Sequence, residues 1–114
     1  MLKFDELVQQ VAPQVRCISA RDAARELKGQ GALVIDVRES AEVSSRPNHR
    51  ATHIPRGVIE LHIGKHCDDP DQAIYLHCAA GGRATLAAEQ LQRMGYRSVT
   101  AIVGKLDEVL ELLD

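Results

Sequence analysis

The segment YLHCAAGGRATL, residues 75–86, places a thiol, four small residues and an arginine in immediate succession. Cys78 ends an apolar run of strand length, and Arg83 opens a stretch of helical periodicity. The side chains between them are small enough for the backbone to curl and turn its N–H groups inward. These four residues are Ala79, Ala80, Gly81 and Gly82. The pattern predicts a nucleophilic cysteine facing a ring of backbone donors.

The surroundings predicted for Cys78 are electropositive. A helix N-terminus carries a partial positive charge, and Arg83 adds a full one. Such a pocket favours the thiolate over the thiol and holds an anion against the sulfur. A lone cysteine after a buried strand is more often a small core residue, and a Gly-Gly pair is often only a turn. The conjunction of strand, cysteine, small residues, arginine and helix favours the reactive interpretation.

Helical and strand patterns alternate along the chain and predict the elements that position this segment. Strand patterns occur at residues 15–19, 32–37, 73–78 and 98–103, and helical spacing occurs at 4–12, 20–28, 83–94 and 106–113. Strands separated by helices predict an α/β fold with a central, mainly parallel sheet between helical layers. Ligands of such sheets bind beyond the carboxyl ends of the strands, where Asp36, Arg38 and Cys78 are expected. Proline and glycine divide residues 39–71 into loops and short elements.

Length and composition bound the function. The 114 residues, 45% apolar, predict one domain over residues 1–114, with 1–13 as an additional N-terminal helix. That helix either covers an edge or groove or engages a partner through Phe4, Leu7 and Val11. The 14 basic and 16 acidic residues favour neither nucleic acid nor an anionic membrane as partner. Without a long apolar run, a cytoplasmic location is expected, and three cysteines argue against a disulfide framework.

Two motifs resemble those of a known family. CAAGGR resembles the active-site loop Cys-x-x-Gly-x-Arg of the rhodanese-like sulfurtransferases, with Cys78, Gly81 and Arg83 in its three defining places. LVIDVRESAE, residues 33–42, resembles the family's first signature, Ile-Asp-Val-Arg-Glu. The resemblance covers about residues 15–110 and implies a rhodanese-like three-layer α/β/α fold. The family's Gly-His-Ile-Pro-Gly-Ala segment falls on residues 46–51 without a gap, or on His53 onward with an insertion.

The resemblance implies a sulfurtransferase. Cys78 would take a sulfur from a small donor such as thiosulfate and pass it from a persulfide to an acceptor thiol or to cyanide. Residues 79–83 would bind the substrate, Asp36 and Arg38 would brace neighbouring loops, and neither a metal nor an organic cofactor is needed. Four residues separate Cys78 from Arg83, against five in related phosphatase loops, which favours sulfur over phosphate. A non-catalytic or sulfur-carrier module that binds a protein partner, and a small phosphatase, are the alternatives.

Several further residues have more than one interpretation. His77 should point to the opposite face of its strand from Cys78 and be structural. Cys67 either joins His62 and His66 in a metal site or receives the sulfur from Cys78. Two remaining positions are simpler: Cys17 is expected to be buried and inert, and Lys105 lies either at the pocket mouth or on the solvated surface.

Overall fold

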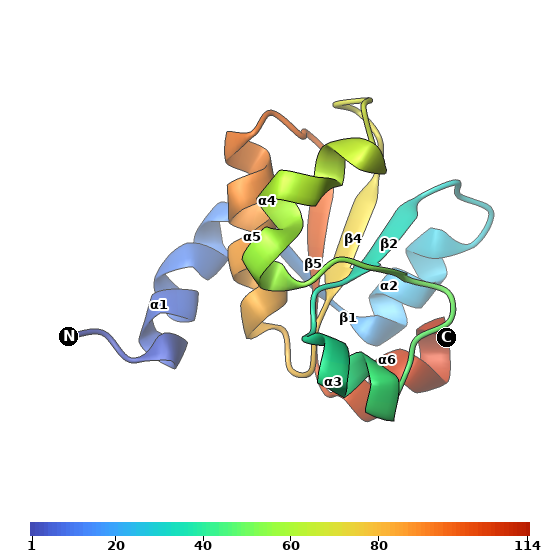
Figure 1. Ribbon diagram of the computed structural model, residues 1–114, viewed down its shortest axis with the longest axis horizontal. Coiled ribbons are helices and arrows are strands. Elements are labelled where there is room, and N and C mark those ends of the chain that lie inside the picture. The colour runs from blue at the N-terminus through green and yellow to red at the C-terminus, as the bar shows by residue number, and fades with distance from the viewer.

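A five-stranded sheet forms the centre of the protein, and the computed structural model describes all 114 residues (Figure 1). The strands lie in the order β1-β5-β4-β2-β3, and every neighbouring pair is parallel. Their bounds are β1 Arg16–Ser19, β2 Leu33–Asp36, β3 Thr52–His53, β4 Ile74–His77 and β5 Val99–Val103. The α/β architecture with a central parallel sheet predicted from the sequence is therefore confirmed.

Helices cover both faces of this sheet (Figure 1). The face carrying α4 and α5 holds the larger apolar cluster, and α2 and α6 cover the other face. Two further helices lie outside these layers: α1 packs against α5, and α3 follows β2. Their bounds are α1 Phe4–Val11, α2 Ala20–Leu27, α3 Ser40–Ser45, α4 Ile59–His62, α5 Gly82–Arg93 and α6 Leu106–Leu113. Three short 3₁₀ turns are η1 Ala12–Gln14, η2 Arg56–Val58 and η3 Ile63–Lys65.

The pleat of β4 decides which way the residues near the thiol face. Ile74 and Leu76 belong to the apolar cluster under α5, whereas Tyr75 belongs to the cluster under α2 and α6. Cys78 continues the first set and packs in the cluster under α5. The thiol is thus delivered to the same side of the sheet as the N-terminus of α5.

The structure differs from the sequence-based expectation in three places. The short strand β3 pairs with β2 inside the region expected to be irregular, because two residues are too few to show an alternating pattern. The helix expected to begin at Arg83 begins at Gly82. Cys17 is only half-buried, because it lies on the edge strand β1, so the prediction of a buried residue is wrong.

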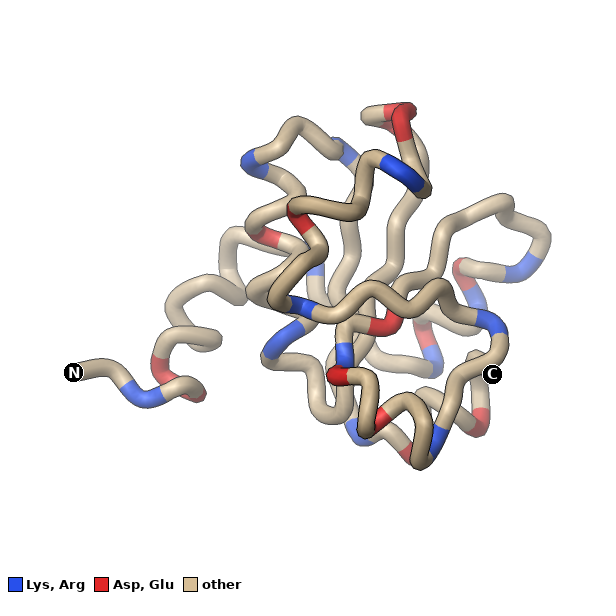
Figure 2. The backbone as a smooth tube through the Cα atoms, in the orientation of Figure 1, with Lys and Arg blue, Asp and Glu red and all other residues tan.

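The charged side chains are dispersed. Figure 2 shows the positions of lysine and arginine interspersed with those of aspartate and glutamate along most of the backbone. No helix combines the length and the apolar character needed to cross a lipid bilayer.

Candidate active site

The loop between β4 and α5 surrounds the thiol with backbone donors. Cys78 is buried, with 2% of its surface exposed, and its Sγ accepts a hydrogen bond from the Gly81 N–H at 3.0 Å. No backbone acceptor in the protein takes the amides of Ala79, Ala80, Gly82 or Arg83. The loop therefore directs one donor at the sulfur and leaves four further amides without a backbone acceptor.

Two adjacent glycines serve this loop for different reasons. Gly81 has φ +112°, a left-handed conformation, and a Cβ there would stand 2.8 Å from the Cα of Val103. Gly82 has no such backbone requirement; a Cβ there would stand 2.7 Å from Cε2 of Phe4. Gly81 is thus needed for the turn itself, whereas Gly82 makes room for the aromatic ring of α1.

Contacts with distant elements fix the shape of the loop. The Gly104 N–H, just after β5, donates to the Ala80 carbonyl oxygen at 3.2 Å. The Thr85 hydroxyl donates to the Gly81 carbonyl oxygen at 2.8 Å, and the Thr85 N–H donates to the same oxygen at 2.9 Å. With these carbonyl oxygens bound on the outside, the loop retains its curl without a ligand.

Arg83 does not present its charge to the loop alone. Its guanidinium donates to both carboxylate oxygens of Glu42 on α3, at 2.6 and 3.0 Å. The hydrogen bonds from Arg83 lower the pKa of Glu42 to about 2, and Glu42 in turn raises the pKa of Arg83. The sequence analysis missed Glu42, since no periodicity or local motif links it to a residue so far along the chain.

Asp36 and Arg38, both predicted to brace loops, form a buried ion pair at the carboxyl end of β2. Each has 1% of its side chain exposed, and the Arg38 NH2 nitrogen lies 2.7 Å from Oδ2 of Asp36. The same nitrogen of Arg38 donates to the Arg46 carbonyl oxygen at 2.7 Å. Nε2 of His53 donates a hydrogen bond to the Arg38 carbonyl oxygen at 2.7 Å. The pair therefore ties β2 to the segment that leads into β3.

The His77 ring contacts Asn48 and the Cys78 main chain rather than the Cys78 thiol. Its Nε2 is 3.0 Å from Nδ2 of the buried Asn48, and its Nδ1 is 3.4 Å from the Cys78 carbonyl oxygen. With Asn48 donating to Nε2, the ring proton sits on Nδ1 and points to that carbonyl. Burial lowers the pKa of His77 more than the nearby Asp36 carboxylate raises it, so the ring is neutral.

Neither of the other two cysteines makes a hydrogen bond with Cys78. Cys67 precedes the loop that enters β4, so it lies at the opposite end of that strand, and its Sγ donates to the Asp69 carbonyl oxygen at 3.3 Å. This position does not favour the hypothesis that Cys67 receives the sulfur of Cys78, which stays a prediction. Cys17 Sγ lies 3.9 Å from the Thr85 hydroxyl. His62, His66 and Cys67 do not converge into a metal-binding group.

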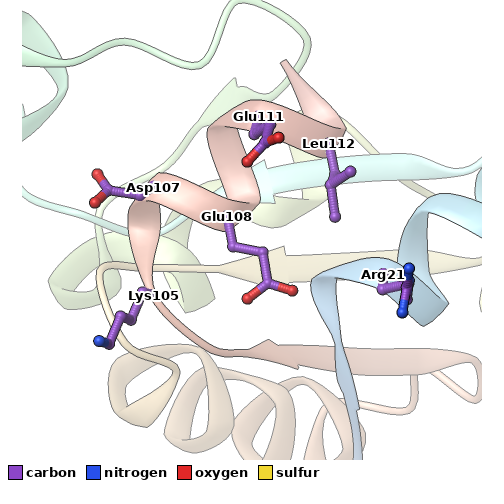
Figure 3. Close-up of a pocket in the computed structure, with 6 residues that line it drawn as sticks. All are labelled: Arg21, Lys105, Asp107, Glu108, Glu111 and Leu112. Carbon is purple, nitrogen blue, oxygen red and sulfur yellow. The ribbon is translucent and has the colours of Figure 1, made fainter.

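Lys105 is exposed and lines a shallow hollow between α2 and α6; it directly follows Gly104, which contacts the Cys78 loop through Ala80. Figure 3 shows its side chain pointing away from Arg21 on the far side of that hollow. The hollow is lined chiefly by charged side chains: Arg21, Lys105, Asp107, Glu108, Glu111 and Leu112. The exposure of Lys105 fits the solvated-surface interpretation, and its place beside Gly104 keeps the pocket-mouth interpretation as a prediction.

Known proteins share this architecture. A family model described as Rhodanese-like domain matches residues 19–111. A polysulfide-sulfur transferase homodimer from Wolinella succinogenes superimposes with a TM-score of 0.75 at 25% identity, over 95% of this chain and 82% of that one. A rhodanese with anions from E. coli gives 0.62 at 27%, over 68% and 91%. A Rhodopseudomonas palustris protein of unknown function, described as a possible tyrosine phosphatase, gives 0.80 at 20%, over 97% and 91%.

Proposed function

The chain belongs to the rhodanese-like domain family, and from this premise we propose that it is a sulfurtransferase in which Cys78 carries the transferred sulfur. The observation that carries the proposal is the loop around Cys78. One backbone N–H already donates to the sulfur, and the neighbouring amides have no acceptor in the protein. Such a loop stabilises a sulfur anion attached to the cysteine.

In the first half-reaction, the Cys78 thiolate attacks the outer sulfur of a donor such as thiosulfate. A bond forms between the two sulfurs while the bond to the sulfonate sulfur breaks, and sulfite leaves with that electron pair. Cys78 then carries a persulfide whose terminal sulfur is negative. The amides of Ala79, Ala80, Gly82 and Arg83 are the donors available to it.

In the second half-reaction, an acceptor thiolate or cyanide attacks that terminal sulfur. The new bond to the acceptor forms as the sulfur–sulfur bond breaks, and Cys78 leaves as the thiolate. Neither step requires a general base at the thiol, in agreement with the position of His77 behind Cys78. Neither step requires a metal ion or an organic cofactor.

Intact mass spectrometry after incubation with thiosulfate tests this proposal. We expect a gain of one sulfur atom that cyanide removes, and we expect Cys78→Ser to show none. Cys67→Ser is the matched control and should load like the wild type, because that thiol lies at the opposite end of β4 from the loop. A wild type that never gains the sulfur, or a Cys78→Ser variant that still does, would contradict the proposal.

The same samples distinguish the alternative functions. A sulfur-carrier module would load the persulfide but fail to turn over with cyanide or small thiols. A phosphatase would hydrolyse p-nitrophenyl phosphate in a Cys78-dependent way. The spacing of four residues between Cys78 and Arg83 supports sulfur over the larger phosphate group, so we expect no such hydrolysis.

A further inference from the structure

The N-terminal helix α1 forms one wall beside the Cys78 loop. The ring of Phe4 and the side chain of Val8 lie against Gly82, where a Cβ would stand 2.7 Å and 3.4 Å from them. Gly82 occupies a variable place of the Cys-x-x-Gly-x-Arg pattern, and α1 lies outside residues 19–111, which the family model matches. The helix and the glycine that accommodates it are thus a paired feature of this chain rather than of the family model.

A groove runs between this helix and the loop. Its volume is about 340 Å³, within the range of small-molecule sites. Phe4 and Val8 supply an apolar wall, and the far side is formed by Ala80 and Gly82, two residues whose amides have no acceptor in the protein. Phe4 is 52% exposed, so its ring is available to a molecule in the groove.

One charged side chain lines this groove, the carboxylate of Asp5. Asp5 takes part in no hydrogen bond and no ion pair, whereas its neighbour Glu6 accepts a hydrogen bond from the Lys3 N–H. Lys3, the N-cap of α1, does not line the groove. The groove is therefore bounded by the thiol loop at one side and by α1, with its one free carboxylate, at the other.

We propose that this groove is the acceptor subsite and that it selects small thiols carrying a positive charge, such as aminothiols. The inference rests on the proposed sulfur transfer at Cys78. An aminothiol that has lost its thiol proton is a zwitterion, and its two ends match the two sides of the groove: the thiolate lies toward the Cys78 loop, and the ammonium lies toward Asp5. Its short carbon chain lies along Phe4 and Val8.

Sulfur transfer to the aminothiol is a displacement at the terminal sulfur. The thiolate of the aminothiol attacks the terminal sulfur of the Cys78 persulfide, and a new sulfur–sulfur bond forms as the bond to Cys78 breaks. Cys78 leaves as a thiolate and the acceptor leaves as a persulfide. Asp5 takes no proton in this step; it only holds the ammonium group.

Rates of persulfide discharge test the subsite. Persulfide-loaded protein, freed of donor, is mixed with cysteamine, with 3-mercaptopropionate or with the neutral 2-mercaptoethanol, and the loss of the added sulfur is followed by mass. We expect Asp5→Asn to lower the ratio of the cysteamine rate to the mercaptopropionate rate by about 2- to 5-fold, the size of an exposed ion pair. Asp5→Lys should lower it further, and high salt should shrink the difference. Asp68→Asn, an exposed carboxylate at the far end of β4, should leave the ratio unchanged.

A second measurement is independent of sulfur transfer. The Cys78 thiolate is reacted with symmetrical disulfides, cystamine or 3,3′-dithiodipropionate, and each mixed disulfide forms as one thiolate of the reagent is released. Asp5→Asn should shift this preference in the same direction as the discharge ratio. A ratio that is the same in wild type and Asp5→Asn in this exchange would overturn the subsite, even if the persulfide loads normally. A missing persulfide with a normal shift in the exchange would instead overturn the proposed function alone.

Discussion

Arg83 donates two hydrogen bonds to the carboxylate of Glu42, a residue on a different helix, so the positive charge nearest the loop is already balanced in the folded protein. An arginine in this motif is easily interpreted as a direct partner of the substrate anion. Here Arg83 links α5 to α3, and we infer that the backbone amides of the loop supply the attraction for the anion. The strength of that attraction should then depend on Glu42.

Replacing Glu42 with glutamine should speed persulfide formation from thiosulfate. The substitution removes one negative charge beside the loop and leaves Arg83 uncompensated, which favours a doubly charged anion by roughly 2- to 5-fold at low salt. The second-order rate of sulfur loading measures the change. Glu108→Gln on α6 serves as the control for a general change in net charge. An unchanged or slower rate in Glu42→Gln would show that the pair instead holds Arg83 in a required position.

The charge state of the pair should be constant through the usual assay range. Glu42 has a pKa of about 2 in the folded protein, against 4.5 for an unperturbed glutamate. The pair therefore contributes its full stability above pH 4.5 and loses it as the pH falls toward 2. Urea unfolding between pH 5 and 2 should show a steeper decline for the wild type than for Glu42→Gln, and parallel curves would contradict this.

Substitution by alanine should destabilise the protein by different amounts at the two adjacent glycines. Gly81→Ala forces a side chain into a left-handed backbone and against the main chain at Val103, so we expect a loss of about 2 kcal/mol or more in unfolding free energy. Gly82→Ala meets the far end of the exposed Phe4 ring, which can swing away, and a Val8 methyl group at an ordinary contact distance of 3.4 Å, so its cost should stay below about 1 kcal/mol. Chemical denaturation measures both. Equal losses would mean that the close approach of Phe4 to Gly82 is rigid.

The buried pair of Asp36 and Arg38 should matter most for stability. Arg38→Met leaves an uncompensated carboxylate in the interior and should cost about 3 kcal/mol or more. The double variant Asp36→Asn with Arg38→Met removes that charge as well, and it should be less destabilised than the sum of its two single variants. Additive losses would show that the two residues act through separate contacts, such as the one from Arg38 to the Arg46 carbonyl oxygen.

His77 should make the protein less stable in mild acid. Its pKa is lowered in the folded state because the ring is buried, so below its ordinary value of 6.5 the unfolded chain binds a proton that the folded chain does not. The unfolding free energy should therefore fall with pH below 6.5, by at most about 1.4 kcal/mol per pH unit. His77→Gln should lose less stability between pH 7.5 and 5.5 than the wild type, whereas the exposed His66→Gln should follow the wild type.

The sequence contained the strands and the thiol loop because both are local patterns. The buried strands around Val34, Leu76 and Ala101 are continuous apolar runs, and Cys78 with its loop fits a contiguous motif. Most of what surrounds the loop is not local. Glu42 meets Arg83, and Asn48 meets His77, only because parallel pairing of β2 and β4 brings their carboxyl ends together.

The contacts of α1 are another feature that local sequence patterns do not predict. Its apolar spacing predicts a helix that covers an edge or groove or engages a partner. The sequence does not distinguish these two roles, because the choice depends on what lies beside the helix. Phe4 and Val8 lie against Gly82, while Leu7 stays largely exposed. No pattern in the sequence predicts that Phe4 and Gly82, which lie far apart in the chain, make contact.

The attachment of the loop to β5 has a consequence for how the protein folds. The Ala80 carbonyl oxygen binds the Gly104 N–H, and Gly81 packs against Val103, so the curl depends on a strand that comes later in the chain. Contacts of this separation form late, after the cost in chain entropy of bringing them together has been met. We therefore expect Cys78 to behave as an ordinary thiol in partly folded chains. The reactivity that we propose for the Cys78 thiol would then appear only once the whole sheet has assembled.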